Sequence, residues 1–224
     1  MTEPVESATP RPTLQVEQKL WRAGLLRVVG VDEAGIGSLA GPVVAGACVL
    51  PVGCQMIEGV RDSKLLSPAQ RERLFERILG QAVAIGVGAA SAREVERLNV
   101  LAAAHLAMRR ALDRARPWDF ALVDGRQIAS LDLGPHRCVI DGDALCYSIS
   151  CASVIAKVTR DRLMCKLAQR HPGYGWERNA GYGTPEHLDA LRRLGLTPHH
   201  RHSFQPVRTL FGETLAPGLL EASN

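Results

Sequence analysis

The stretch from Val28 to Pro51, VVGVDEAGIGSLAGPVVAGACVLP, constrains the fold of this chain more than any other. An apolar run ends in two adjacent carboxylates, Asp32 and Glu33, and a glycine-rich turn leads into a second apolar run, Pro42 to Leu50. Both runs have the length and composition of buried strands. Because neighbouring side chains on a strand point to opposite faces, the two acids can reach one point only where the strand ends and its backbone turns.

This acid pair has two interpretations. An arbitrary Asp-Glu pair usually lies on a hairpin with its carboxylates in water. Here the pair follows a buried strand and precedes Gly35, Gly37 and Gly41, which permit a tight turn and the close approach of another backbone. Carboxylate oxygens at such a turn can hold a hard cation. The spacing alone suggests a metal site without establishing one.

Composition places the chain among globular proteins. At 224 residues, with 46% hydrophobic and 22% charged residues, it fits one large domain or a domain with a small appendage. No apolar run approaches the ~20 residues of a membrane helix, and the N-terminus lacks the pattern of a secretory signal. Six cysteines without a CxxC pair indicate buried, reduced thiols rather than disulfides or zinc. We therefore expect a cytoplasmic protein without a membrane partner.

Apolar runs alternate with helical patterns along the rest of the chain. Three further strands are predicted, at 82–90, 120–123 and 138–140. Helices are predicted at 14–23, 68–79, 91–114, 147–170 and 185–194, the last capped by Thr184. The chain is expected to be mostly irregular after Pro198. This order indicates an α/β fold with a mixed sheet and a helical C-terminal extension.

Two more acids stand where predicted strands end. Asp124 closes the fourth strand and Asp143 follows the fifth, as Asp32 follows the first. Strand ends converge in open α/β sheets, and four carboxylates with no basic residue in their motifs would raise one another's pKa. Divalent cations would relieve this repulsion, and oxygen-only ligands favour Mg²⁺ or Mn²⁺ over zinc. For a single acid the alternative is a turn cap, which fits Asp141 and Asp62 best.

The C-terminal third is basic. Residues 156–202 contain nine Lys or Arg, four Asp or Glu and five of the seven histidines. This indicates a polyanionic ligand, although charge alone favours an ordinary solvated helix face. We expect His199, His200 and His202 to lie on a solvated loop near phosphate rather than to bind a metal. Tyr174 and Trp176 are expected to pack rather than to stack on nucleotides.

Motifs throughout the chain stand in the order of one known family. They are GVDEAG and LAGPVV within 30–44, DSKLLS at 62–67, VDG at 123–125, GD at 142–143, SISCASVIAKVTRDRLM at 148–164, HPGYGW at 171–176, GYGTPEH at 181–187 and HRHSF at 200–204. Together they resemble type 2 ribonuclease H, the bacterial ribonuclease HII family, over roughly residues 27–208. A single motif would be weak evidence, but so many in register are highly specific.

The resemblance implies a ribonuclease H-like mixed five-stranded sheet flanked by helices. We expect a catalytic domain (25–170) and a helical substrate-binding extension (171–212), preceded by a flexible N-terminal tail with a short helix (1–24) and followed by a tail (213–224). The implied enzyme is an endoribonuclease that uses Mn²⁺ or Mg²⁺. It hydrolyses the RNA strand of RNA–DNA hybrids and nicks 5′ of ribonucleotides in duplex DNA, leaving a 3′-hydroxyl. We expect a monomer, and a replication or repair clamp is left open as a partner.

The resemblance also assigns residues by matching position. The implied catalytic, metal-binding acids are Asp32, Glu33, Asp124 and Asp143. The implied substrate contacts are Gly35, Ile36 and Gly37 at the ribose 2′-hydroxyl, Tyr182 at the sugar of the RNA–DNA junction, and Lys64, Lys157 and Arg160 at phosphates. One bound cation would activate the attacking water and the other would stabilise the departing 3′-oxygen.

Two positions depart from the family pattern. Ile36 stands where the family usually has arginine, and Asp141 stands where it commonly has lysine. A 2′-hydroxyl read by backbone groups would survive the first change, but a cationic side chain near the phosphate is missing. We expect weaker substrate binding, by ~1–3 kcal/mol for a lost charged hydrogen bond.

Two rival functions remain at this point. A ribonuclease H-like DNA nuclease would not depend on a 2′-hydroxyl. A hybrid-binding protein without catalysis would need one of the four acids to be missing, and all four are present. Cleavage of a duplex with a single ribonucleotide distinguishes the three.

Overall fold

A mixed five-stranded sheet forms the centre of the molecule in the computed structural model, which describes residues 11–126 and 133–211. The strands are β1 Val28–Ala34, β2 Val43–Val49, β3 Ala84–Ala90, β4 Phe120–Asp124 and β5 His136–Val139. Their order is β3-β2-β1-β4-β5, with antiparallel pairs on the β3 side of β1 and parallel pairs on the β5 side. The predicted mixed α/β sheet is confirmed, although β3 begins two residues later than expected and β5 earlier.

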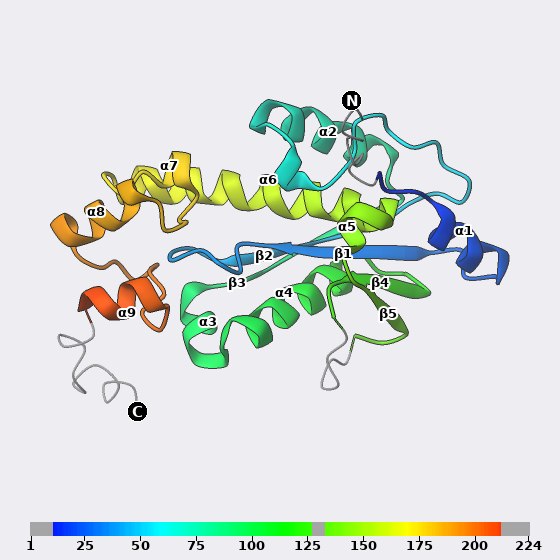
Figure 1. The fold of residues 1–224 in the computed structure, drawn as a ribbon. Coiled ribbons are helices and arrows are strands. Elements are labelled where there is room, and N and C mark those ends of the chain that lie inside the picture. Colours follow the sequence, from blue (N-terminus) through cyan, green and yellow to red (C-terminus); the bar gives the residue numbers. More distant parts are fainter. Residues whose placement is uncertain (1–10, 127–132, 212–224) are drawn as a thin grey trace, which may run out of the picture.

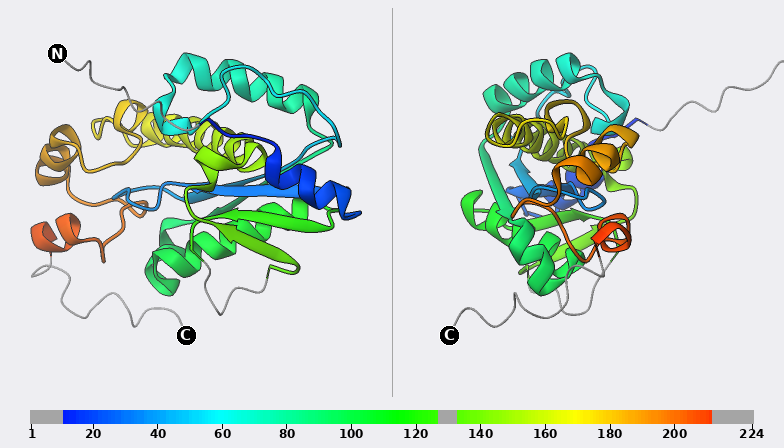
Figure 2. Two further views of the ribbon diagram at one scale, coloured as in Figure 1. Left: turned by 45° about the vertical axis from the view of Figure 1, so that its right-hand side comes forward. Right: turned by 90° about the vertical axis from the view of Figure 1, so that its left-hand side faces the viewer.

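Helices cover both faces of this sheet (Figure 1, Figure 2). One face carries α2 Pro68–Gln81 and α6 Tyr147–Arg170, and the other carries α3 Ala92–Leu98 and α4 Val100–Arg114. The remaining helices are α1 Gln15–Arg22, the 3₁₀-helix η1 Ser63–Leu65, α5 Gly142–Leu145, α7 Trp176–Asn179, α8 Pro185–Leu194 and α9 Gln205–Phe211. Within the described ranges, none of the helices combines the length and apolar character that crossing a membrane requires.

Small residues let the long helices pack directly on the sheet backbone. A Cβ added at Gly30 in β1 would lie 2.1 Å from the carbonyl carbon of Ser148 in α6. A Cβ at Gly86 in β3 would lie 1.9 Å from the carbonyl oxygen of Ala111 in α4. Only glycine permits such close approach. The position of α6 over β1 therefore follows from the sequence of both elements.

Helix caps account for most of the correct boundaries and for one error. Ser67 begins α2 and Thr184 begins α8, as predicted. The single helix predicted over 91–114 is wrong, because Asn99 adopts φ 68° and interrupts it. The Asn99 side chain then accepts hydrogen bonds from the backbone N–H groups of Leu101 and Ala102, which starts α4. The expectation of a mostly irregular chain after Pro198 is also wrong, since α9 lies there.

The N-terminal helix is part of the core. Leu14 and Trp21 are buried, and Glu17 is fully buried. Oε1 of Glu17 accepts hydrogen bonds from the backbone N and the Oγ of Ser148, at 2.8 and 2.7 Å. The short helix predicted over 14–23 is therefore confirmed as α1, and its Glu17 caps the start of α6. The tail predicted at 213–224 lies outside the described residues.

The C-terminal helices form a third hydrophobic cluster, beyond one end of the sheet (Figure 2), in addition to the two that pack on the sheet. Tyr174 and Trp176 are buried there and their rings stack at 5.1 Å, which confirms their predicted packing role. Leu39 from the loop after β1 and Met164 from α6 belong to the same cluster. The extension is thereby packed against the loop that follows the acid pair.

All six cysteines are free thiols, as predicted. Cys48, Cys146 and Cys151 are buried, but the expectation of burial is wrong for Cys165, which is exposed.

Candidate active site

Three of the predicted acids lie at adjacent strand ends. β1 and β4 are parallel neighbours, paired in register through Val31 and Val123. Asp32 and Asp124 directly follow this pair, and Glu33 is the next residue of β1. Because parallel strands end at the same edge of a sheet, register brings these acids together.

The fourth acid arrives from α5. The backbone N–H of Gly142 donates to Oδ1 of Asp124 at 2.7 Å, and Asp143 follows directly. A Cβ at Gly142 would lie 3.1 Å from that oxygen and 2.6 Å from Ile149, so glycine suits this position. Asp141 has left-handed backbone geometry (φ 53°), but its side chain makes no capping hydrogen bond, contrary to our expectation.

Burial and mutual repulsion dominate the electrostatics of these acids. Asp32 and Asp143 are 4% and 6% exposed. Burial raises the pKa of Asp32 well above its usual range, and the charges of Glu33, Asp124 and Asp143 add to the rise. Burial and the charge of Asp124 raise the pKa of Glu33 to about 7. Burial likewise raises the pKa of Asp124 and of Asp143. The charges of neighbouring acids thus raise the pKa values of Asp32, Glu33 and Asp143, whereas burial raises that of Asp124.

One lysine from a different motif, DSKLLS, lies beside these acids. Nζ of Lys64 lies 3.4 Å from Oδ2 of Asp143 and 3.9 Å from Oδ1 of Asp62. The Lys64 side chain is 75% exposed and remains open to a further anion. Asp62 also accepts the backbone N–H of Lys64, so its predicted role as a turn cap is confirmed. A single exposed lysine does not balance four carboxylates.

The chemistry of the donors fits a hard divalent cation. All four side chains offer oxygen atoms, as Mg²⁺ and Mn²⁺ require. In the described part of the chain, no three His, Cys, Asp or Glu side chains form a ready-made metal cluster. Asp32, Glu33, Asp124 and Asp143 therefore fit a site that a bound cation would complete.

The loop after β1 lies beside these acids. Gly35 is buried with φ +95°, and a Cβ there would lie 2.0 Å from Nε of Arg160. Ile36 is half-buried and packs against the hydrophobic cluster that includes β1, β2 and α4. Gly37 is exposed, with nothing within 4 Å of an added Cβ. The loop thus presents backbone rather than side chains at its tip.

Two of the residues predicted to contact phosphates, Arg160 and Lys157, have intramolecular partners. Arg160 is fully buried, and its guanidinium donates to Ser38 Oγ and to the carbonyls of Ala40, Pro42 and Ala180. The assignment of Arg160 to phosphate is therefore wrong, because burial leaves it no access to a ligand.

Lys157 is 17% exposed and pairs with Asp161 at 2.6 Å. Burial lowers the pKa of Lys157, although Asp161 opposes this effect. Tyr182 is 36% exposed, with Lys157 Nζ 5.9 Å and Arg160 Cζ 5.4 Å from its ring centroid. Its position leaves the ring available for stacking.

The segment that contains His199, His200 and His202 differs from the predicted solvated loop. His200 is 2% exposed, and its Nδ1 lies 2.9 Å from the backbone N of Thr197, which donates to it. Nε2 of His200 lies 3.2 Å from Nε2 of His187. Burial and the neighbouring His187 lower the pKa of His200 to about 3. The prediction of a solvated loop is wrong for this residue, which packs against Trp176.

Sequence reasoning also missed Arg201, which is fully buried beside His200. It donates to the carbonyls of Ile36 and Gly41, more than 150 positions earlier in the chain. The HRHSF motif contained the signal, but only its histidines were interpreted.

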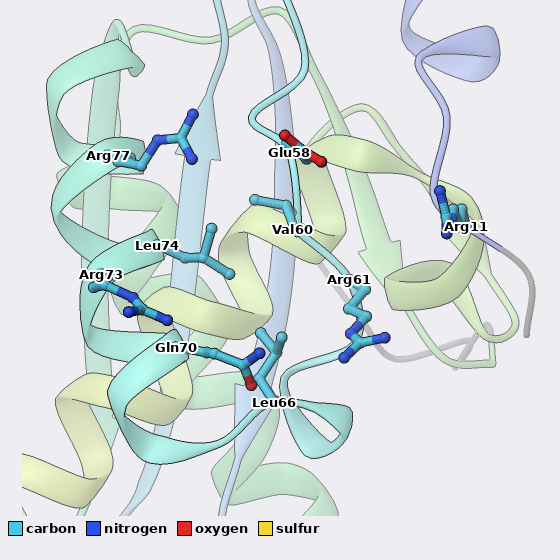
Figure 3. Close-up of a pocket in the computed structure, with 10 residues that line it drawn as sticks. Arg11, Glu58, Val60, Arg61, Leu66, Gln70, Arg73, Leu74 and Arg77 are labelled. Carbon is cyan, nitrogen blue, oxygen red and sulfur yellow. The ribbon is translucent and has the colours of Figure 1, made fainter.

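A separate basic pocket of about 470 Å³ opens between α2 and the segment before η1 (Figure 3). Its lining includes Arg11, Arg61, Arg73 and Arg77, with Glu58 as its acid. The four predicted acids do not line it.

Comparisons with known proteins agree with this architecture. The family model for ribonuclease HII matches residues 29–207. The chain is 56% identical to ribonuclease HII of Thermosynechococcus vestitus, over 86% of this chain and 90% of that protein. It is 51% identical to ribonuclease HII of Ruegeria pomeroyi, over 89% and 85%.

Among solved structures, ribonuclease H2 of Pyrococcus horikoshii superposes with a TM-score of 0.67. The two sequences are 29% identical, and the match covers 84% of this chain and 98% of that one. Bst-RNase HIII in complex with Mn²⁺ superposes with a TM-score of 0.68 at 16% identity, covering 85% and 70%, and so shares the fold. The chain therefore belongs to the ribonuclease HII family and is a ribonuclease H endonuclease.

Proposed function

We propose that this enzyme hydrolyses the RNA strand of RNA–DNA hybrids and nicks 5′ of single ribonucleotides in duplex DNA, leaving a 3′-hydroxyl. The observation that carries the proposal is the convergence of four buried or half-buried carboxylates with raised pKa values. Such a centre is unstable alone and is suited to divalent cations.

Asp32, Glu33, Asp124 and Asp143 would hold Mn²⁺ or Mg²⁺. When bound, these ions supply an activated water and charge stabilisation for the leaving oxygen in phosphodiester hydrolysis. Asp124 is held in place by the Gly142 N–H, and Lys64 holds Asp143. Two of the four oxygen-donor side chains are thus held by hydrogen bonds within the protein.

Substrate recognition falls to the surfaces beside the acids. The backbone of Gly35, Ile36 and Gly37 would meet the ribose 2′-hydroxyl, the group that distinguishes RNA from DNA. Tyr182 would stack on the sugar at the junction. Lys64 and Lys157 would contact phosphates, with Lys64 the more exposed of the two.

The proposal extends to the setting of the enzyme. We propose a monomer that acts in the cytoplasm, with a sliding clamp as a candidate partner. A solved structure of the PCNA:RNase HII complex from Archaeoglobus fulgidus, 23% identical to this chain, motivates the clamp. Gel filtration with and without a clamp tests both points: a lone protein at twice its 24.2 kDa mass contradicts the monomer, and no shift with the clamp contradicts that partner.

Cleavage of three matched duplexes tests the function. One has a single embedded ribonucleotide, one an RNA strand, and one only DNA, each with Mn²⁺, Mg²⁺ or EDTA. We expect cuts in the first two with metal, ending in 3′-hydroxyls, and none with EDTA. Equal cutting of the all-DNA duplex would favour a DNA nuclease, and binding without cutting would favour a hybrid-binding protein.

A further inference from the structure

Two buried arginines donate hydrogen bonds to the loop between β1 and β2, residues 35–42. Arg160 comes from α6 and Arg201 from the C-terminal extension, and both are fully buried. Within the described ranges, neither forms an ion pair with a carboxylate. A buried charge without a counter-ion is costly unless hydrogen bonds satisfy it.

All the acceptors of Arg201 belong to this loop. Nη1 donates to the carbonyl of Ile36 at 2.8 Å. Nε and Nη2 donate to the carbonyl of Gly41 at 3.1 and 2.9 Å. Arg201 thus bridges both ends of the loop with one rigid, planar group.

Arg160 fixes the middle of the same loop. Its Nη2 donates to Ser38 Oγ at 2.6 Å and to the carbonyl of Ala40 at 3.1 Å. The Ser38 hydroxyl in turn donates to the carbonyl of Gly35 at 2.9 Å. Arg160, from a distant segment, thus holds the Ala40 carbonyl, and Ser38 of the loop itself holds the Gly35 carbonyl.

The direction of these carbonyls determines where the N–H groups point. In a trans peptide, the carbonyl of one residue and the N–H of the next point in opposite directions. Because Arg201 holds the Ile36 carbonyl inward, the Gly37 N–H points outward. Because Ser38 holds the Gly35 carbonyl, the Ile36 N–H points away from Ser38. In the described part of the chain, neither N–H has a hydrogen-bond acceptor, whereas the Gly41 N–H donates to His199.

We propose that Arg201, with Arg160 and Ser38, is a positioning residue that aims the N–H groups of Ile36 and Gly37 at the substrate. This inference rests on the proposed function and deepens it: the C-terminal extension sets the discrimination between a ribonucleotide and a deoxyribonucleotide. The residue carrying that discrimination does not touch the ribose. It acts through the backbone of a loop more than 150 residues earlier in the chain.

A merely structural role would anchor the extension without affecting discrimination. The two roles differ in one ratio, the affinity for a duplex with one ribonucleotide divided by the affinity for the matched all-DNA duplex. Loss of anchoring lowers both affinities together. Loss of aimed donors lowers only the first, because the all-DNA duplex has no 2′-hydroxyl to lose.

The experiment measures this ratio in EDTA, so that neither duplex is cut, for the full chain and for Arg201→Gln, Arg201→Lys and Ser38→Ala. For Arg201→Gln we expect roughly a tenfold fall in the ratio, the usual effect of a lost hydrogen bond. The all-DNA affinity should change less than about threefold. Arg201→Lys keeps the charge but loses the planar guanidinium with its several donors. Its affinity ratio should lie between those of the unmodified protein and Arg201→Gln.

Arg162→Gln is the matched control, because Arg162 is on α6 but pairs with Glu72 away from the loop. Its ratio should equal that of the unmodified protein. If circular dichroism shows that Arg201→Gln is unfolded, the test uses Ser38→Ala instead. We expect this variant to lower the affinity ratio too, but by less than Arg201→Gln.

An unchanged ratio in a folded variant, or an equal loss for both duplexes, would overturn the inference. A wild-type protein that cuts neither ribonucleotide substrate would instead overturn the proposed function. The two failures are therefore distinguishable.

Discussion

The acid centre and the adjacent glycine-rich loop both bury charge, but in opposite ways. In the acid centre, Asp32, Glu33, Asp124 and Asp143 repel one another, and their pKa values are raised. Under the loop, two buried guanidiniums donate to neutral oxygens and need no counter-ion. The first region is incomplete without a ligand, whereas the second is complete and serves as a scaffold. An unsatisfied buried charge indicates binding, and a satisfied one indicates support.

The largest effect is expected from a substitution of Asp124 in the acid centre. We expect Asp124→Asn to lower cleavage at least about 100-fold, because even partners of metal ligands contribute 10–100-fold. Its folding stability in EDTA should stay equal or rise, because one repelling charge is removed. Cleavage rates and urea midpoints measure both effects, with the exposed Asp113→Asn as the control. Near-normal cleavage by Asp124→Asn would remove Asp124 from the site.

The repulsion among the acids can be tested through the pH dependence of folding stability at Glu33. Its pKa is about 7 in the folded protein and ordinarily 4.5. Between these values the folded state holds a proton that the unfolded state lacks, so in EDTA this contribution to stability falls as pH rises from 4.5 through 7. We expect Glu33→Gln to remove a decline on the order of 1–3 kcal/mol.

Urea unfolding of both proteins at several pH values between 4.5 and 8 measures this difference. Adding Mn²⁺ at pH 8 should restore stability to the unmodified protein more than to Glu33→Gln. Parallel pH profiles for the two proteins would contradict a strained acid at this position.

The substrate affinity of the loop after β1 can be tested by restoring the arginine that the family usually has at position 36. Ile36→Arg adds a cation beside a substrate phosphate, and we expect roughly tenfold tighter binding of the single-ribonucleotide duplex. The gain should shrink with added salt, as a phosphate contact requires. Because Ile36 is half-buried against the core, the thermal midpoint of the variant should be measured alongside. A folded variant with unchanged affinity would contradict the expected deficit.

The smallest effect is expected where arginines are exposed rather than buried. Arg73 and Arg77 lie on α2 beside the basic pocket (Figure 3). Among the described residues, no carboxylate pairs with them, since Glu72 and Glu76 on the same helix pair with Arg162. We expect the double change to Gln to weaken binding of a long duplex severalfold and to flatten its salt dependence.

The matched control is Arg93→Gln with Arg97→Gln. These two arginines have the same spacing on α3, against the opposite face of the sheet. Equal losses from the two pairs would show a general charge effect rather than a contact at the pocket.

The four acids could be predicted because each stands at the end of an apolar run. The strand register then brings three of the acids together, and the Thr184 cap and Gly195 were sufficient to place α8. The break at Asn99 could have been predicted, since Asn tolerates left-handed geometry and caps helices.

The arginine scaffold could not be predicted from local patterns. Arg160 lies in a helix whose buried side includes serines, alanines and a cysteine, so no polar stripe shows which way it points. Its acceptors, like those of Arg201, are backbone carbonyls on distant segments. Every residue type carries such a carbonyl, so the sequence contains no mark of the partner.

The most direct test of the central claim is a crystal of the enzyme with Mn²⁺, examined by anomalous scattering. We predict manganese within about 2.5 Å of carboxylate oxygens of Asp32, Glu33, Asp124 and Asp143. Manganese bound elsewhere with these four acids uncoordinated, at a concentration that supports cleavage, would contradict the account.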